Sequence, residues 1–392
     1  MPRPQVRQHP QRLDLLKMDL LETARRVSVA DPRGCRVVTG FDGFVDEMIS
    51  VVGERRTLDD FAPVPDIGTF GAMIAAAAGQ SSLREIVVTA VQPGGCAVNL
   101  ADGLASLGAT VDCFATIGEP PHPAFSNIAV KCHGFSSWGP EPGRTLAFEF
   151  NDGKLMFSAV EQLAGFTPHS VRELLTDGTY TAACEVAQVI ALTDWSLYPY
   201  MTQVWRLLQS EVFSLLTHRP ALFIDLVDPS TRSVADIRDM AAILHEFEPV
   251  GPVTLGLNGN EANVLCRAHD VSSAPGDATP EQTLQQAFAL RDLFGVTRVV
   301  IHRVPFAVSA AAEGGSMQPG PYSAGTKKST GAGDRFNAGF CLGLALGLDD
   351  SESLVLGCAA SGFFVRNARS ASRQELVGFL EDWAAGFVDR SS

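Results

Sequence analysis

The feature of this 392-residue chain that most constrains its fold is an alternation of short β-rich runs with longer helical segments. The β-rich runs lie at residues 36–39, 85–91, 110–116, 189–193, 221–226, 253–257 and 298–302. Apolar residues at helical spacing lie between them, at residues 96–107, 200–216, 234–247, 261–268 and 280–294. Strands that alternate with helices form βαβ units, so the pattern predicts an α/β fold with a mainly parallel sheet.

One hairpin interrupts this alternation. Residues 144–158, RTLAFEFNDGKLMFS, form two alternating runs that are joined by Asn, Asp and Gly at 151–153, which favour a tight turn. We therefore assign the hairpin to a small β element outside the main sheet. Two segments rich in Ser, Pro and Gly, 271–280 and 311–325, are predicted to be surface loops.

The N-terminal part of the chain lies outside the alternation. Residues 1–12 are polar and contain proline, so we expect no regular structure there. Apolar residues at helical spacing predict a helix over residues 13–29. We therefore divide the chain into an N-terminal extension with a helix, residues 1–30, and one large domain, residues 31–392.

Composition excludes several classes of protein. Hydrophobic residues make up 46% of the chain, enough for a large core, and no apolar run is long enough to cross a bilayer. The net charge of −14 argues against a nucleic-acid partner, which needs a basic surface. The eight cysteines include no C-x-x-C pair, as expected of reduced thiols. We expect a soluble, cytoplasmic protein that binds neither nucleic acid nor a membrane.

Two glycine-rich segments stand out. In residues 327–340, KKSTGAGDRFNAGF, three small residues run into Asp334 and then into a helical pattern. This is either a turn with a helix N-cap or a helix N-terminus whose free N–H groups bind an anion. In residues 93–118, PGGCAVNLADGLASLGATVDCFATIG, Gly94 and Gly95 precede Asn99. The two glycines either serve turns and packing, or they let the backbone approach a ligand whose hydroxyls Asn99 binds.

Together the two segments resemble the signatures of the ribokinase-like (PfkB) carbohydrate kinase family. The upstream positions that match are Gly94, Gly95, Ala97, Asn99, Ala101, Gly108 and Gly118. The downstream segment carries the Gly-Ala-Gly-Asp core, and the resemblance covers about residues 37–368. It implies ATP-dependent phosphorylation of a hydroxyl group of a sugar or sugar-like substrate. It also implies a three-layer domain, with helices on both faces of the sheet, and a small β-sheet lid with strands from about 44–61 and 144–158.

The resemblance implies a role for each residue of the downstream segment. Gly331, Ala332 and Gly333 form an anion hole for the γ-phosphoryl group, and Asp334 is the catalytic base. Thr330, together with Gly331 and Gly333, contacts the nucleotide. A side chain at the glycines would obstruct the phosphoryl group.

The resemblance also implies a magnesium site. Asn258 and Glu261, in LNGNEANVL, match the Asn-x-x-Glu motif of the family, which organises Mg²⁺ through water around the nucleotide phosphates. Asn258 is also a predicted nucleotide contact. The residues alone leave open a simpler interpretation, in which Asn258 ends a strand and Glu261 caps a helix.

For the sugar, the resemblance implies Gly94, Gly95, Asn99 and an acid of the segment GFDGFVDE. Asp42 and Asp46 are both candidates, and their spacing does not decide between them. The hairpin would close over the sugar and exclude water. Its alternative role is to pair with the lid of a second subunit in a homodimer.

The chain departs from the family pattern at three places. Lys328 stands where relatives usually have an acid that helps to hold a monovalent cation. A lysine argues against that ion, and we put forward that its ammonium replaces it; alternatively, Lys328 points to solvent. Arg303 and Pro305 replace a glycine turn, and EPPHPAF replaces a Gly–acid loop.

Two other functions were weighed. A catalytically silent sugar or nucleotide sensor on the same scaffold would have been favoured by loss of the base or anion hole, which are both present. A dinucleotide-dependent oxidoreductase needs a G-x-G-x-x-G turn after the first strand, and the glycines do not follow that spacing. The sequence leaves open which sugar, sugar phosphate, sugar acid or nucleoside is phosphorylated.

Overall fold

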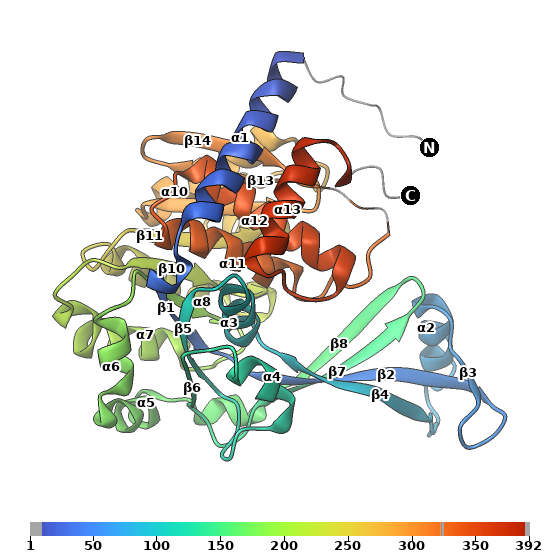
Figure 1. Ribbon diagram of the computed structural model, residues 1–392. Coiled ribbons are helices and arrows are strands. Elements are labelled where there is room, and N and C mark those ends of the chain that lie inside the picture. Colours follow the sequence, from blue (N-terminus) through green and yellow to red (C-terminus); the bar gives the residue numbers. More distant parts are fainter. Residues whose placement is uncertain (1–9, 322, 324, 389–392) are drawn as a thin grey trace.

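The computed structural model describes residues 10–388, except residues 322 and 324. Most of the segment 1–12 lies outside the described residues, but its last part already belongs to helix α1, Pro10–Val29. This helix packs against α13, Arg373–Ala384, and α12, Asp350–Asn367, and Arg26 forms an ion pair with Glu352. The N-terminal helix is therefore part of the packed structure (Figure 1).

The main sheet confirms the predicted α/β architecture. Its nine strands in the described chain have the order β14-β13-β12-β11-β10-β9-β1-β5-β6. Seven of them pair in parallel: β1 Arg36–Phe41, β5 Thr110–Ala115, β6 Gly134–Ser137, β9 Val189–Thr193, β10 Ala221–Asp225, β11 Val253–Asn258 and β12 Arg298–Arg303. An antiparallel hairpin, β13 Phe306–Ala311 and β14 Gly314–Pro319, completes one edge.

Helices cover both faces of this sheet. Successive strand residues point to opposite faces, so Val37 of β1 joins one apolar cluster and Val38 joins the other. The larger helices of the Val37 side are α1, α3 Cys96–Ser106, α11 Ala332–Ala345, α12 and α13, beside the short α4 Ser126–Ala129. The larger helices of the Val38 side are α7 Met201–Glu211, α8 Val234–Phe247, α9 Gly259–Ala268 and α10 Pro280–Phe294, beside the shorter α5 Pro168–Leu174 and α6 Thr179–Cys184. The fold thus has three layers.

A second, five-stranded sheet projects from this domain (Figure 1). Its strands are β2 Phe44–Arg55, β3 Phe61–Pro63, β4 Ile86–Gly94, β7 Gly143–Phe150 and β8 Gly153–Ala159. Helix α2, Ile67–Ala75, covers one face, where Phe70 packs on Phe148 and Phe150 at 5.8 and 5.3 Å between ring centroids. We call this sheet with its helix the lid.

Two expectations about individual strands were wrong. The βαβ alternation predicts that residues 85–91 belong to the main sheet, but β4 pairs antiparallel with β2 in the lid. A local pattern cannot tell which sheet a strand joins, because partners lie far away in sequence. Within the expected loop 311–325, residues 314–319 form β14, which pairs with β13. Its small residues are typical of a loop, so the sequence pattern does not indicate this strand. Over the described residues, no helix combines the length and apolar character needed to span a membrane.

Candidate active site

The site lies where the strands of the main sheet end and α3 and α11 begin. Asp42, just after β1, is 1% exposed. Its carboxylate accepts hydrogen bonds from the backbone N–H of Ala97 at 2.8 Å, from the Thr193 hydroxyl at 2.6 Å and from the backbone N–H of Cys96. Asp42 therefore holds the N-terminus of α3 in place, and its oxygens are already used by the protein.

Asp46, on β2, instead faces a pocket between the lid and the main domain. Burial raises the pKa of Asp46, while the Thr145 hydroxyl and the Lys328 ammonium act to lower it. Residues from the lid and from both glycine-rich segments line the pocket: Asp46, Met48, Gln92, Pro93, Asn99, Ala147, Lys154, Met156, Lys328 and Thr330. Gln92 and Lys154 were not predicted, because their long side chains reach the pocket from lid strands whose register the sequence does not reveal.

The predicted glycines of the upstream segment are required by close packing. A Cβ atom at Gly94 would lie 2.5 Å from the Asp46 carboxylate, and one at Gly95 would lie 2.6 Å from the backbone oxygen of Asp42. Gly95 also has a φ of 96°, which side chains other than glycine rarely allow. These glycines let β4 and α3 pass directly beside both acids.

The second glycine segment forms the start of α11. Gly331 is the N-cap residue in a left-handed conformation with a φ of 88°. The N–H of Ala332 donates to the Ser329 carbonyl at 3.0 Å. In the described chain, the N–H groups of Gly333 and Asp334 have no acceptor. Two free donors at the positive end of a helix are suited to contact an anion.

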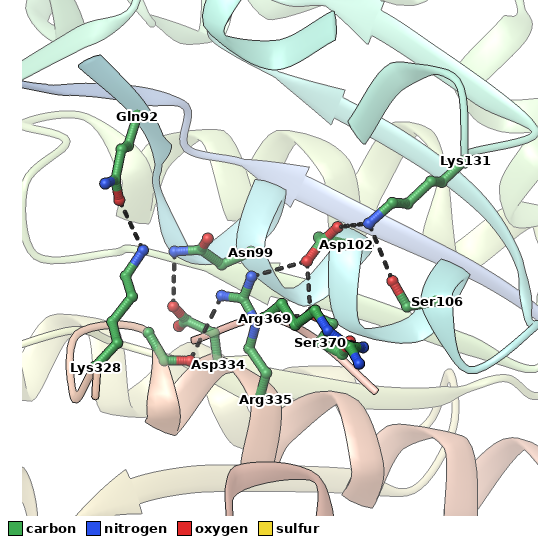
Figure 2. A network of polar contacts seen from close by, with 11 residues as sticks. Gln92, Asn99, Asp102, Ser106, Lys131, Lys328, Asp334, Arg335, Arg369 and Ser370 are labelled. Atoms are coloured by element: carbon green, nitrogen blue, oxygen red, sulfur yellow. Dashed lines mark hydrogen bonds and ion pairs between the residues drawn. The ribbon is translucent and has the colours of Figure 1, made fainter. Parts of the chain in front are cut away.

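Asp334 lies in the first turn of α11 and is 8% exposed. The side-chain amide of Asn99, from α3, donates to its Oδ2 atom at 2.9 Å (Figure 2). Burial raises the pKa of Asp334 to about 7; Arg335 opposes this shift, and Asp225 adds to it. A carboxylate whose pKa lies near neutral pH is suited to take up a proton during a reaction.

Asp225, at the end of β10, is the main acid that the sequence analysis missed. It accepts a hydrogen bond from the Asn337 side chain at 2.6 Å, and burial raises its pKa to about 6. An acid at the carboxyl end of a buried strand was the available signal, since ligands of α/β sheets bind at that edge.

Oxygen atoms around Asp225 fit a hard divalent cation. The thiol of Cys96 and the carboxylates of Asp225 and Asp334 each place one atom within 4.8 Å of the others. The Oδ1 atom of Asn337 is buried and has no hydrogen-bond partner in the part of the chain that is described. Mg²⁺ prefers oxygen ligands, so the carboxylates, not the thiol, suit it.

Asn258 and Glu261 form a capping box at the start of α9. The Asn258 backbone N–H and side-chain amide donate to the two Glu261 oxygens at 2.7 and 2.6 Å, and Asn258 Oδ1 accepts from the Glu261 N–H at 3.0 Å. The capping interpretation of these residues is therefore correct. Burial, aided by Asp225, also raises the pKa of Glu261 to about 8, as expected for an acid beside other acids.

Lys328 does not point to solvent. Its ammonium donates to the Gln92 side-chain oxygen at 2.8 Å, and burial lowers its pKa (Figure 2). It lies 5.9 Å from the centre of the Phe364 ring. The cation therefore lines the same pocket as Asp46.

Comparison with known proteins identifies the family. Residues 14–383 match the family model described as prokaryotic ketohexokinase. The chain belongs to the prokaryotic ketohexokinase family. It is a carbohydrate kinase, as the two glycine-rich segments predicted, so the oxidoreductase alternative is wrong.

Further relatives of this ketohexokinase-family protein support the assignment. A ketohexokinase of Haloferax volcanii is 27% identical over 363 residues, covering 91% of this chain and 92% of the relative. A ribokinase from Cryptococcus neoformans in complex with ADP has a TM-score of 0.60 at 15% identity, covering 89% of this chain and 99% of its own. A ribokinase from Thermotoga maritima has a TM-score of 0.58 at 15% identity, covering 88% and 99%. Both structures confirm the ribokinase-like fold.

Proposed function

We propose that this protein transfers the γ-phosphoryl group of ATP to a hydroxyl group of a ketohexose. The observation that carries the proposal is the hydrogen bond between Asn99 and Asp334. Asn99 lines the same pocket as Asp46, so this bond places Asp334, a carboxylate with a raised pKa, beside that pocket. The Haloferax relative is a ketohexokinase, and the Cryptococcus ribokinase structure is a complex with ADP. Both names agree with a sugar acceptor and a nucleotide donor.

In this proposal, Asp46 and not Asp42 binds the sugar. Both oxygens of Asp42 accept hydrogen bonds from the protein, whereas Asp46 lines the pocket. A carboxylate accepts hydrogen bonds from adjacent hydroxyls, and the amides of Asn99 and Gln92 both donate and accept. Gly94 and Gly95 act indirectly, because their missing side chains leave room for the two acids.

The start of α11 would hold the phosphoryl group. The free N–H groups of Gly333 and Asp334 and the dipole of α11 stabilise negative charge there, and Thr330 and Gly331 border the nucleotide. Asp334 takes the proton from the attacking hydroxyl, while Asn99 fixes the orientation of its carboxylate. Phosphoryl transfer mainly needs such positioning and charge stabilisation.

Mg²⁺ would supply further charge neutralisation on the ATP phosphates when it is bound. Asp225, Asn258 and Glu261 stand at the carboxyl ends of β10 and β11, where their oxygens can hold the metal's waters. Because Glu261 is already paired with Asn258, its contact with the ion would pass through water.

The lid would close over the sugar. Ala147, Lys154 and Met156, from β7 and β8, form the roof of the pocket, which excludes water from the reacting groups. The lid also exposes Ile86, Val88 and Phe157, apolar side chains that a homodimer through the lid would bury.

The test is a comparison of acceptors by the rate of ADP formation. Ketohexoses, aldohexoses, pentoses, sugar phosphates, sugar acids and nucleosides are supplied at matched concentrations with ATP and Mg²⁺. We expect the highest kcat/KM for a ketohexose. A higher value for any other class would refute the proposed acceptor.

Two variants then separate the acids. Asp46→Asn is expected to raise the KM for the ketohexose about tenfold or more with little change in the KM for ATP, because it removes uniform binding of the acceptor. Asp42→Asn is the matched comparison, and it should lower the melting temperature because it weakens the anchor of α3. The opposite pattern would assign the sugar to Asp42.

A further inference from the structure

A buried ionic cluster lies beside the phosphoryl position. Arg335, the residue after Asp334, donates from Nη2 to Asp102 of α3 at 2.9 Å and from Nε to the Ser370 hydroxyl at 3.1 Å. Ser370 and Lys131 also donate to Asp102, each at 2.6 Å (Figure 2). The Arg335 and Asp102 side chains are only 9% and 10% exposed.

The start of a helix is an unfavourable place for a cation such as Arg335. A cation in the first turn of α11 opposes the helix dipole, and burying a charged pair costs about as much as the pair returns. Arg335 and Lys131 share the single carboxylate of Asp102, and Arg335 also acts to lower the pKa of the neighbouring Asp334. A guanidinium next to the free N–H groups of a helix start points to a role in binding negative charge.

Arg335 also supports the turn that forms the anion-binding position. Its backbone N–H and its Nη1 atom donate to the Gly331 carbonyl at 3.2 and 3.5 Å. Its guanidinium lies over the Phe364 ring, 4.6 Å from the centroid, and a Cβ at Gly331 would lie 2.9 Å from Nη1. The guanidinium therefore packs directly against the peptide whose orientation sets the direction of the following N–H groups.

The cluster joins the acceptor side of the site to the phosphoryl side. Asn99 and Asp102 are three residues apart on α3, so they share one face of that helix. Asn99 contacts Asp334, and Asp102 contacts Arg335. Two consecutive residues of α11 are thus held by two residues of one α3 face, which fixes the register of the two helices.

We propose that Arg335, held by Asp102, is a positioning residue for phosphoryl transfer: it fixes the Gly331 peptide and adds positive charge behind the γ-phosphoryl position. The inference rests on the proposed function. It assigns a role to a residue outside the Gly-Ala-Gly-Asp core.

The test compares ATP with ADP, because only ATP carries the phosphoryl group that the cluster would stabilise. Arg335→Met and Arg335→Lys are measured beside the control Arg298→Met. Arg298 forms a similar ion pair with Asp350, 15% and 19% exposed, at the start of β12, away from the site. Calorimetry without acceptor gives the affinities for ATP and ADP, and steady-state assays with a ketohexose give kcat and KM.

We expect Arg335→Met to weaken ATP binding about tenfold more than ADP binding and to lower kcat about ten- to a hundredfold. The KM for the sugar should change little. Arg335→Lys keeps the charge and should recover part of the loss. Equal effects on ATP and ADP with a kcat like that of Arg298→Met would overturn the inference.

Two measures keep the test decisive. If Arg335→Met shows no cooperative melting, Asp102→Asn decides, since it frees the guanidinium without removing it. A several-fold loss of kcat in that variant supports the inference, and an unchanged kcat refutes it. The ATP-to-ADP comparison needs no acceptor, so a wild type that binds ATP but does not phosphorylate a ketohexose refutes only the proposed function.

Discussion

Replacement of Asp334 by Asn removes the proposed base with little change in shape. Asn keeps a side chain that can accept a hydrogen bond from Asn99, but it cannot take a proton from the sugar hydroxyl. We expect kcat to fall by about two to four powers of ten. The affinity for ATP should stay close to that of the wild type, because the N–H groups at the start of α11 are unchanged.

The pH dependence follows from the environment of Asp334. Burial raises its pKa from 3.8 to about 7, and only the ionised carboxylate accepts a proton. Wild-type kcat/KM should therefore rise about tenfold per pH unit below pH 7 and level off above about pH 8. The kcat/KM of Asp334→Asn should lack this rise with pH.

The same shift predicts an effect on stability. A raised pKa means that the folded protein binds this proton more tightly than the unfolded chain does. Ionisation of Asp334 therefore lowers stability as the pH rises from 3.8 to about 7, by about 4 kcal/mol at most above that range. Asp334→Asn should melt at a higher temperature than the wild type at pH 8, and this difference should disappear near pH 4.

The assay is ADP formation between pH 5 and pH 9, with thermal melting of the same samples. The control is Asp112→Asn, which changes an equally buried acid of β5 that pairs with His133. A role of Asp334 as the base is refuted if Asp334→Asn keeps most of its turnover, or if the wild-type profile is flat from pH 5.5 to pH 8.

Three further predictions address the pocket and the lid. Wild-type activity should barely respond to potassium at matched ionic strength, whereas Lys328→Met should become activated several-fold by it; strong activation of the wild type would reject a built-in cation. Gly94→Ala should raise the KM for the sugar because its Cβ would displace the Asp46 carboxylate. Gly71→Ala, which has open space around its Cβ, should leave this KM unchanged. Equal KM values for the two variants would contradict the packing argument. Hydrogen exchange in β7 and β8 should slow when sugar and nucleotide are added, with α13 as the internal reference; equal protection in both states would argue against a closing lid.

Most of the fold could be predicted from local sequence patterns. The βαβ rhythm predicted the parallel sheet because burial on both faces produces continuous apolar runs, and turn chemistry predicted the hairpin of β7 and β8. The membership of β4 in the lid could not be predicted, since it depends on pairing with β2 across more than one intervening element. Strand β14 was missed because glycine and serine carry little strand signal.

Within the site, sequence motifs located the residues but not their contacts. Asp334 and Asn99 were both singled out, yet their pairing joins positions 235 residues apart. The choice between Asp42 and Asp46 depends on which carboxylate the start of α3 uses. Arg335 becomes informative only beside its partner Asp102. Asp225 did carry a signal, an acid at the carboxyl end of a buried strand, but no motif marked it.

Transfer of a phosphoryl group from ATP to a ketohexose at this site can be followed in a single reaction. The most direct measurement incubates the wild type and Asp334→Asn with ATP, Mg²⁺ and fructose, and quantifies ADP and sugar phosphate in the same sample. We expect equal amounts of both products from the wild type and almost none from the variant. Sugar phosphate formed at the same rate by both proteins, or ADP formed by the wild type without sugar phosphate, would contradict it.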